Sequence, residues 1–332
     1  MSDTSIMTID GLEAQIGKKP ANIDLKVIDH LDVGARKWAE MCSLMFIALS
    51  TNEGSVATIA GGIAGFIEAE EKRLKLPLTS IDDSFGISPG AGFGSLLVLP
   101  GIGETLRING HISDYDAESI TVSVSECYIH CAKAIIRSDF WSPVYKAHST
   151  DDPIQTIDHS RFLALATSDE DGNADLSPKG DPSSALAIAD GEYIWLADRP
   201  GNRRADSFRN MLRQPKVAGI FLSPGQSQVQ IFQGVAEPTY HAMRERLAVQ
   251  ERVPKIATRI SIANLRSETS QAIETSRIWT RETANISPSK ILGEHLKLNK
   301  KRSVSARIVG TVSGIPGVLE KSLEADYKKN LY

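Results

Sequence analysis

The chain has 332 residues, of which 41% are hydrophobic and 23% are charged, with a net charge of −4. This composition provides apolar residues for two domain cores, and it excludes a disordered chain, a collagen and a small disulfide-stapled protein. The acidic balance argues against a dedicated nucleic-acid binder, which would carry a strongly basic face. Three cysteines are too few for a secreted disulfide framework, and neither a signal peptide nor a membrane-length apolar stretch is seen. We therefore expect a soluble, cytoplasmic protein that binds neither nucleic acid nor a membrane.

Helical periodicity appears first at residues 22–45, where apolar residues recur on one face, and two later helices are predicted at 202–213 and 240–251. Short strands separated by turn residues dominate elsewhere. The strands expected in the second half are at 162–168, 184–190, 191–198, 217–223 and 228–238. This spacing is typical of a barrel or sandwich rather than of a doubly wound sheet. The predicted fold is mainly β with flanking helices, in the α+β class.

Two pairs of similar segments occur in the same order along the chain. Residues 97–112 (LVLPGIGETLRINGHI) align without a gap with 221–236 (FLSPGQSQVQIFQGVA), and each segment reads as strand, Pro-Gly turn and strand. Residues 46–51 (FIALST) align in the same way with 162–167 (FLALAT). We interpret the pairs as the trace of a tandem duplication, and chance similarity between two β-hairpins is the alternative.

The polar segment 142–160, which contains two prolines, is the natural linker between the two halves. It divides the chain into a first half at 1–145 and a second half at 146–332. Just before the linker, residues 126–141 read as a strand that turns into a short helix.

The densest cluster of polar side chains is at 198–210 (DRPGNRRADSFRN), around a Pro-Gly turn. Its arginines are Arg199, Arg203, Arg204 and Arg209. Asn202 or Asp206 is expected to cap a following helix. Guanidinium groups near a helix N-terminus bind anions, so the segment favours a phosphate site, with a solvated basic helix start as the alternative.

Two further segments carry candidate ligand-binding residues. In 177–181 (SPKGD), Lys179 beside Gly180 would let a cation and an open backbone approach a ligand together, although an ordinary turn also fits. In 103–110 (GETLRING), three polar residues alternate with apolar ones on a strand, where they face either a ligand or water. These are Glu104, Arg107 and Asn109.

Cys127, His130 and Cys131 lie close together, but no second Cys/His pair completes a structural zinc site, so no metal is expected. We predict that the two cysteines are buried as small hydrophobic residues. The chain also has no G-x-S-x-G hydrolase motif.

Four motifs together resemble the FMN-binding split β-barrel flavoproteins related to pyridoxamine 5′-phosphate oxidase. The closest subgroup carries SPRGD, RPGNxRxDSxRN, LxxPGxGETLRxNG and CAKALxRSxLW. The matching segments here are SPKGD (177–181), DRPGNRRADSFRN (198–210), LVLPGIGETLRING (97–110) and HCAKAIIRSDFW (130–141). The segments at 12–40 and 323–332 also resemble the two ends of that subgroup, so the resemblance covers most of the chain.

The chain departs from this family in how the motifs are distributed. A usual member carries all four in one copy and forms a homodimer with an FMN in each of two interface sites. Here SPKGD and RPGN occur only in the second half, and GETLRING and CAKA only in the first. The resemblance therefore implies two tandem split barrels that form an intramolecular pseudo-dimer with one composite FMN site, and further homodimerisation stays open.

The resemblance also implies roles for single residues. The phosphate and ribityl side of FMN would be held by Lys179, Arg199, Asn202, Arg203 and Arg209. Ser177 would lie beside the isoalloxazine ring, and the first half would contribute Arg107, Asn109, Lys133, Arg137 and Ser138. Arg107 is the candidate catalytic residue, as a cation that stabilises reduced flavin. Lys179 replaces the arginine that is usual in the subgroup, so a bidentate phosphate contact becomes a point charge.

By resemblance, the function is that of an FMN-dependent oxidoreductase that transfers hydride through flavin N5 to or from a small molecule, with oxygen or NAD(P)H as the electron partner. A haem-binding or haem-handling split barrel is the first alternative, with His111, His130 or His241 as the axial ligand. A non-catalytic flavin-binding protein is the second. The substrate is not indicated.

Overall fold

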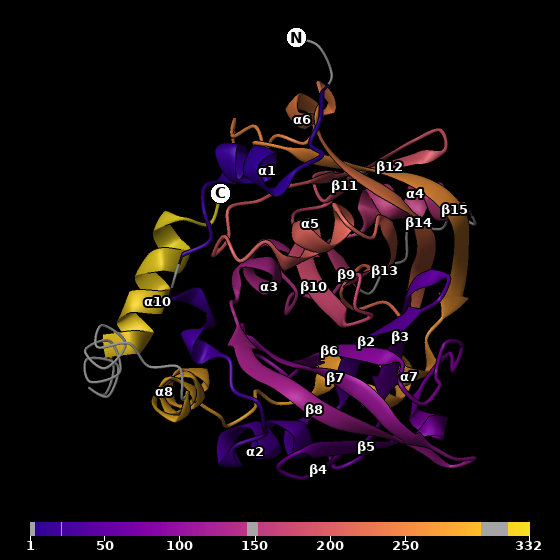
Figure 1. Cartoon of the computed structure of the whole chain (residues 1–332), viewed down its shortest axis with the longest axis vertical. Coiled ribbons are helices and arrows are strands. Elements are labelled where there is room, and N and C mark those ends of the chain that lie inside the picture. The colour runs from indigo at the N-terminus through magenta and orange to yellow at the C-terminus, as the bar shows by residue number, and fades with distance from the viewer. Residues whose placement is uncertain (1–3, 21, 145–151, 300–317) are drawn as a thin grey trace.

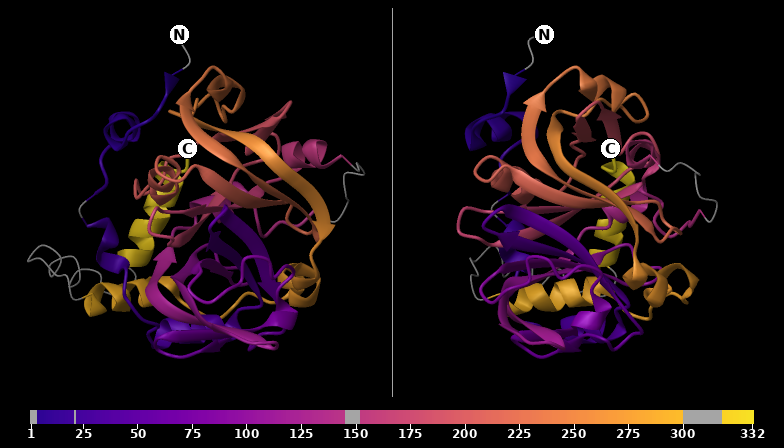
Figure 2. Two further views of the ribbon diagram at one scale, coloured as in Figure 1. Left: turned by 45° about the vertical axis from the view of Figure 1, so that its right-hand side comes forward. Right: turned by 90° about the vertical axis from the view of Figure 1, so that its right-hand side faces the viewer.

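The computed structural model describes residues 4–20, 22–144, 152–299 and 318–332, which form two antiparallel sheets stacked on each other with helices around them (Figure 1). Views turned by 45° and 90° show the same two layers with the chain's two halves above and below (Figure 2). The mainly β, α+β prediction is confirmed. No helix among the described residues is long and apolar enough to cross a membrane.

The first sheet is built from the first half of the chain, in the spatial order β3-β2-β6-β7-β8-β5-β4. Its strands are β2 (Leu44–Thr51), β3 (Gly54–Gly61), β4 (Glu68–Ala69), β5 (Arg73–Pro77), β6 (Gly92–Val98), β7 (Thr105–Tyr115) and β8 (Ser119–His130). The hairpin predicted at 97–112 is β6 and β7.

The second sheet has the order β10-β9-β13-β14-β15-β12-β11, and β1 (Thr4–Ser5) adds to β14. Its strands are β9 (Phe162–Ser168), β10 (Ala174–Gly180), β11 (Ala187–Asp190), β12 (Tyr193–Ala197), β13 (Lys216–Leu222), β14 (Gln228–Tyr240) and β15 (Ala257–Thr269). The five predicted strands are present, and β10 and β15 were not predicted. When strands are numbered by their place in each half, the two sheets have the same order.

The two sheets also share an irregularity at aligned positions. The β7–β8 ladder shifts register between Asn109 and Gly110, and the β14–β15 ladder shifts between Gln233 and Gly234. A Cβ on Gly110 would lie 2.0 Å from a carbonyl oxygen of β8, and one on Gly234 would lie 2.4 Å from a carbonyl oxygen of β15. Only glycine fits at either bulge.

Apolar side chains from both sheets form one core between them. Phe46 of β2 and Phe162 of β9, which are aligned in the sequence repeat, meet with ring centroids 5.5 Å apart. Leu176 of β10 and Ile220 of β13 belong to the same cluster. The halves therefore share this apolar cluster, in addition to the clusters that belong to each sheet.

The helices lie around the sheets. They are α1 (Ile9–Ile16), α2 (Val33–Met41), α3 (Lys133–Arg137), α4 (Pro153–His159), α5 (Asp206–Met211), α6 (Met243–Arg246), α7 (Gln271–Ser276), α8 (Pro288–Leu298) and α10 (Val318–Lys329), with 3₁₀ turns at Ile23–Lys26, Leu78–Ser80 and Ile278–Thr280. Both chain ends cross between the halves. Leu12 of α1 packs in the core of the second sheet, whereas Ile291 of α8 packs in the core of the first.

Three predicted helices are shorter than expected. The helix predicted at 22–45 begins only at Val33, because the side chain of Asp32 accepts a hydrogen bond from the backbone of Ala35 and caps α2 there. In place of the helix predicted at 202–213, the structure has the shorter α5, and in place of the helix predicted at 240–251 it has the shorter α6. The predicted linker at 142–160 contains α4, and its residues 145–151 lie outside the described residues.

Candidate functional site

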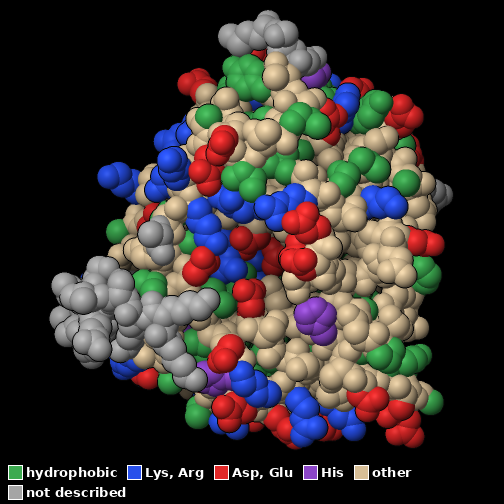
Figure 3. All heavy atoms as spheres, in the orientation of Figure 1, with side chains coloured by type: hydrophobic (Ala, Val, Ile, Leu, Met, Phe, Trp, Pro, Cys, Tyr) green, Lys and Arg blue, Asp and Glu red, His purple; other side chains and the backbone are tan. Residues whose placement is uncertain are grey.

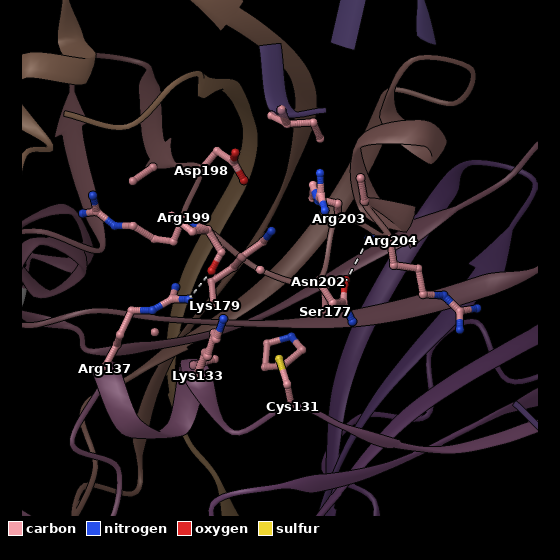
Figure 4. A pocket seen from close by; sticks show the side chains of 18 of the residues that line it. Cys131, Lys133, Arg137, Ser177, Lys179, Asp198, Arg199, Asn202, Arg203 and Arg204 are labelled. Carbon is pink, nitrogen blue, oxygen red and sulfur yellow. Dashed lines mark hydrogen bonds between the residues drawn. The ribbon is translucent and has the colours of Figure 1, made fainter. Parts of the chain in front are cut away.

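A cavity of about 740 Å³ opens between the two halves, within the size range of small-molecule sites. Figure 3 shows Lys, Arg, Asp and Glu side chains gathered in the hollow at its mouth, and Figure 4 shows the interior. The second half contributes residues 177–181, at the end of β10 and just after it. It also contributes residues 197–208, from the end of β12 through the next loop into α5. The first half contributes Arg107 and residues of the segment from His130 to Arg137. The four motifs, which are divided between the halves in sequence, therefore meet in one cavity.

The SPKGD segment is part of strand β10 and not a turn. Because β10 is an edge strand, Pro178 can occupy it without losing a ladder hydrogen bond in the sheet interior. Gly180 packs directly on α3, and a Cβ there would lie 1.9 Å from the carbonyl oxygen of Ala134. This close approach brings Lys133 and Arg137 of α3 beside Lys179 of β10.

The loop before α5 has an unusual backbone. Arg203 and Ala205 have φ of 58° and 56°, in the left-handed region, which non-glycine residues rarely adopt outside functional sites. The Asn202 side chain accepts a hydrogen bond from the backbone of Arg204, at 3.0 Å. The predicted cap of α5 by Asn202 or Asp206 is wrong, because Ala205 holds the N-cap position without a side-chain bond.

A buried ion pair ties SPKGD to RPGN. Arg199 Nε donates to Asp181 Oδ2 at 2.7 Å, and the two side chains are only 6% and 2% exposed. Arg199 Nη2 donates to the carbonyl oxygens of Ala185 and Leu247. Most of the Arg199 donors thus bond within the protein, and the remaining nitrogen, Nη1, has no hydrogen bond to the described residues.

Arg107 is fully buried at the junction of the two halves. Its Nη1 donates to Tyr128 at 2.7 Å and to Asp175 at 2.9 Å, and its Nη2 bonds to the carbonyl oxygen of Leu176. Ser177 lies 3.5 Å away. The guanidinium therefore joins β7 and β8 of the first sheet to β10 of the second, at the floor of the cavity.

Lys179 and Asp198 line the cavity, and burial shifts the pKa of each. Burial lowers the pKa of Lys179, against the attraction of Asp198. Burial also raises the pKa of Asp198 to about 6, although Lys179 and Arg137 act in the opposite direction. The Lys179 ammonium lies 5.2 Å from the centre of the Phe208 ring, which offers a cation–π contact.

Three residues expected in the site do not line the cavity. Asn109 donates to Glu126 and Asp175 beneath it, Arg209 pairs with Glu13, and Ser138 is buried behind α3. The other expected residues line it, namely Arg107, Lys133, Arg137, Ser177, Lys179, Arg199, Asn202 and Arg203.

The structure adds cavity residues that the sequence did not single out. Asp181 and Asp198 lie at the edges of the SPKGD and DRPGNRRADSFRN motifs, and Arg252, Asp326 and Tyr332 come from segments far along the chain. The resemblance at 323–332 gave Asp326 and Tyr332 no role in the site, and only the fold brings these last three residues to the cavity.

Cys127 is buried as predicted, but Cys131 is half-exposed and lines the cavity, so that part of the prediction is wrong. Cys131 ends up there because it lies between the end of β8 and the start of α3. Among the described residues there is no group of three or more His, Cys, Asp or Glu placed to hold a metal ion.

Comparison with known proteins gives one family. Residues 151–287 match the family model described as pyridoxamine 5′-phosphate oxidase. No curated protein matches the chain.

Solved structures of low identity align with parts of the chain. HupZ of Group A Streptococcus is 18% identical over 38% of this chain and 95% of its own, with a TM-score of 0.29. A putative pyridoxamine 5′-phosphate oxidase from Lactobacillus delbrueckii is 18% identical over 35% of this chain and 91% of its own, with a TM-score of 0.28. A conserved hypothetical protein from Mycobacterium tuberculosis is 21% identical over 43% of this chain and 97% of its own, with a TM-score of 0.28.

Proposed function

We propose, from the premise that residues 151–287 form a split barrel of the pyridoxamine 5′-phosphate oxidase family, that the chain binds FMN at one composite site and acts as an FMN-dependent oxidoreductase. The observation that carries the proposal is the single cavity in which the SPKGD and RPGN segments of the second half face GETLRING and CAKA of the first. A small molecule would be the substrate, with oxygen or NAD(P)H as electron partner.

The cavity suits a phosphate-bearing planar cofactor. Lys133, Arg137, Lys179 and Arg203 surround its polar end, and the Nε of Arg137 is buried without a hydrogen-bond partner among the described residues. Such an unused donor gains most from a charged acceptor. The glycine contact between β10 and α3 keeps these cations close together.

When bound, FMN would supply two-electron chemistry at N5, and the chain would supply position and charge. Arg203 and Arg137 would hold the phosphate, with Lys179 as a further positive charge. Ser177 would lie beside the ring. We propose that Arg107 acts as a fixed positive charge near the ring, because its terminal nitrogens are held by Asp175, Tyr128 and Leu176 and its proton is not available for transfer.

Asn109, Arg209 and Ser138 would act as positioning residues behind this site. Asn109 supports Asp175, which in turn holds Arg107. Arg209 fixes α1 on α5 through its pair with Glu13. These roles differ from direct cofactor contact, because none of the three lines the cavity.

The tandem pseudo-dimer is part of the proposal. It is supported by the identical strand order of the two sheets and by the glycine bulges at aligned positions. Gly61 at the end of β3 packs on α7 as Gly180 packs on α3, since a Cβ on Gly61 would lie 2.1 Å from the carbonyl oxygen of Ala272. The two contacts occupy equivalent places in the two halves.

A second cavity, of about 400 Å³, lies at the Gly61 contact, where the partner site of a symmetric dimer would be. Among the described residues, its lining contains no Lys or Arg and includes the acids Asp82 and Glu268. Asp82 already accepts a hydrogen bond from the backbone of Ala272 at 2.8 Å. A phosphate would be repelled there, which supports one FMN per chain.

The test is the absorbance spectrum of the purified full chain, with released flavin quantified per chain, before and after incubation with FMN. One FMN per chain supports the composite site, whereas two per chain or one per two chains contradicts it. A Soret band without flavin would favour the haem alternative, for which His130 is the cavity-lining candidate. Bound FMN that NAD(P)H and oxygen leave unchanged would favour a non-catalytic flavin-binding protein.

A further inference from the structure

The C-terminal segment contributes Asp326, Asn330 and Tyr332 to the lining of the cavity. Figure 1 shows the ribbon of α10 leading to the C-terminus. Asp326 of α10 pairs with Lys133 at 2.9 Å. The Tyr327 hydroxyl accepts a hydrogen bond from the backbone of Ala132 and donates one to Glu104. These contacts fasten the end of the chain to the GETLRING and CAKA segments, and they deliver the last residue into the cavity.

The last residue, Tyr332, is surrounded by arginines. The guanidinium carbons of Arg137 and Arg199 lie 5.9 and 5.7 Å from the centre of its ring, within cation–π range. Arg252 Nη1 donates to the main-chain oxygen of Tyr332. An aromatic ring and the main-chain oxygen beside it are therefore held together by three guanidinium groups.

These contacts match the chemistry that recognises an aromatic carboxylate. Guanidinium groups stack on aromatic faces and bind carboxylates in a fork. Arg199 also keeps its Nη1 without a hydrogen bond to the described residues, so the place has a donor that Tyr332 does not use. Arg137 and Arg199 belong to the FMN motifs, so this place adjoins the proposed FMN site.

We propose that the place held by Tyr332 is a subsite for an aromatic carboxylate substrate, and that the C-terminus covers it while no substrate is bound. The assignment as a substrate subsite rests on the proposed function, but binding at this place does not. Because the C-terminal segment is part of the same chain, it competes with a free ligand at a high effective concentration. The apparent affinity for the free ligand is the intrinsic affinity multiplied by the fraction of chains in which the subsite is open.

The experiment uses 3-(4-hydroxyphenyl)propionate as the ligand, which reproduces a tyrosine ring and a carboxylate. It is titrated by calorimetry into the full chain and into a chain that lacks Asn330–Tyr332, each as purified and after FMN loading. We expect the trimmed chain to bind at least about tenfold more tightly. In the trimmed chain, Arg252→Gln should weaken binding about tenfold. Arg213→Gln, which changes an exposed arginine paired with Glu170, is the matched control and should change nothing.

Equal affinity in the full and trimmed chains would overturn the proposal, as would absence of binding to the trimmed chain or an equal effect of Arg213→Gln. Tyr332→Gly in the full chain is the second variant, because it removes the ring and keeps both α10 and the main-chain oxygen that accepts from Arg252. Tighter binding to this variant supports the proposal, and unchanged binding contradicts it. FMN loading is read separately from the visible flavin absorbance, so a failure to bind flavin counts against the proposed function alone.

Discussion

The glycine that joins β10 to α3 offers a direct test of how the fold positions the site. In Gly180→Ala, the new Cβ would lie 1.9 Å from the carbonyl oxygen of Ala134. A carbon and an oxygen that are not bonded need more than 3 Å, so α3 or β10 must move by about 1 Å. The carbonyl oxygen of Ala134 belongs to the backbone of α3, so it cannot rotate away as the end of a side chain could. Overpacking of this kind costs about 3 kcal/mol.

The assay is thermal unfolding together with FMN titration, and two further variants separate the effects. Gly201→Ala lies in the RPGN loop, where its Cβ would meet nothing closer than an oxygen at 4.0 Å, so stability should change by less than about 0.5 kcal/mol. Gly61→Ala would create the equivalent clash with Ala272, at 2.1 Å, in the other half. It should destabilise as Gly180→Ala does, but the chain that stays folded should bind FMN normally.

Gly180→Ala should weaken FMN binding as well as stability, because Lys133 and Arg137 move with α3. The reasoning is refuted if Gly180→Ala unfolds at the same temperature as the unchanged chain. It is also refuted if Gly61→Ala loses FMN affinity as strongly as Gly180→Ala does. Of these two glycines, Gly180 lines the proposed FMN cavity and Gly61 lines the second one.

Three other changes probe the charges of the cavity. Arg199→Leu should destabilise by about 3–5 kcal/mol in chemical unfolding, because it leaves Asp181 buried without its partner, and a double variant that also carries Asp181→Leu should recover part of the loss. Burial raises the pKa of Asp198 from 3.8 to about 6, so its contribution to stability is present below about pH 3.8 and is lost as the pH rises through 6. Asp198→Asn should therefore be the more stable protein above pH 6, by about 3 kcal/mol, with no advantage near pH 3.8, and a constant difference across a pH series of melts would contradict this sign. Arg203→Ala should weaken FMN binding about tenfold in a fluorescence titration, whereas Arg213→Ala should leave it unchanged.

The sequence predicted the parts of the fold that depend on local pattern. Alternating apolar residues and Pro-Gly turns located the β6–β7 and β13–β14 hairpins. The repeat aligned Phe46 with Phe162 but did not predict their contact across the two sheets. The helix predicted at 22–45 failed in its first part because periodicity does not register the cap at Asp32. An ordinary turn stayed open as an alternative for SPKGD, because Pro and Gly are turn residues in most contexts, and the edge position of β10 permits them in a strand.

The site was predictable as far as it lies in contiguous motifs, and no further. Arg199 was expected to bind phosphate, but its partners Asp181, Ala185 and Leu247 come from separate segments, and they use most of its donors inside the protein. The same limit applies to Tyr332, whose place beside Arg137 depends on how the chain end crosses to the junction of the halves. A motif specifies residue types, whereas tertiary structure decides which of them have donors left for a ligand.

A duplicated and fused chain frees its two interface sites to differ, which two identical subunits cannot do. Both cavities retain the glycine–helix contact that shapes them, at Gly180 and at Gly61. Their charges differ, because one cavity is lined by Lys133 and Lys179, whereas the other contains Asp82 bound to the helix that follows it. The glycines maintain the packing of the sheets on their helices, and on the proposed function the cations would in addition hold a ligand. If the second cavity no longer binds FMN, its glycine should still be needed for stability, and the Gly61→Ala and Gly180→Ala pair measures that separation of roles.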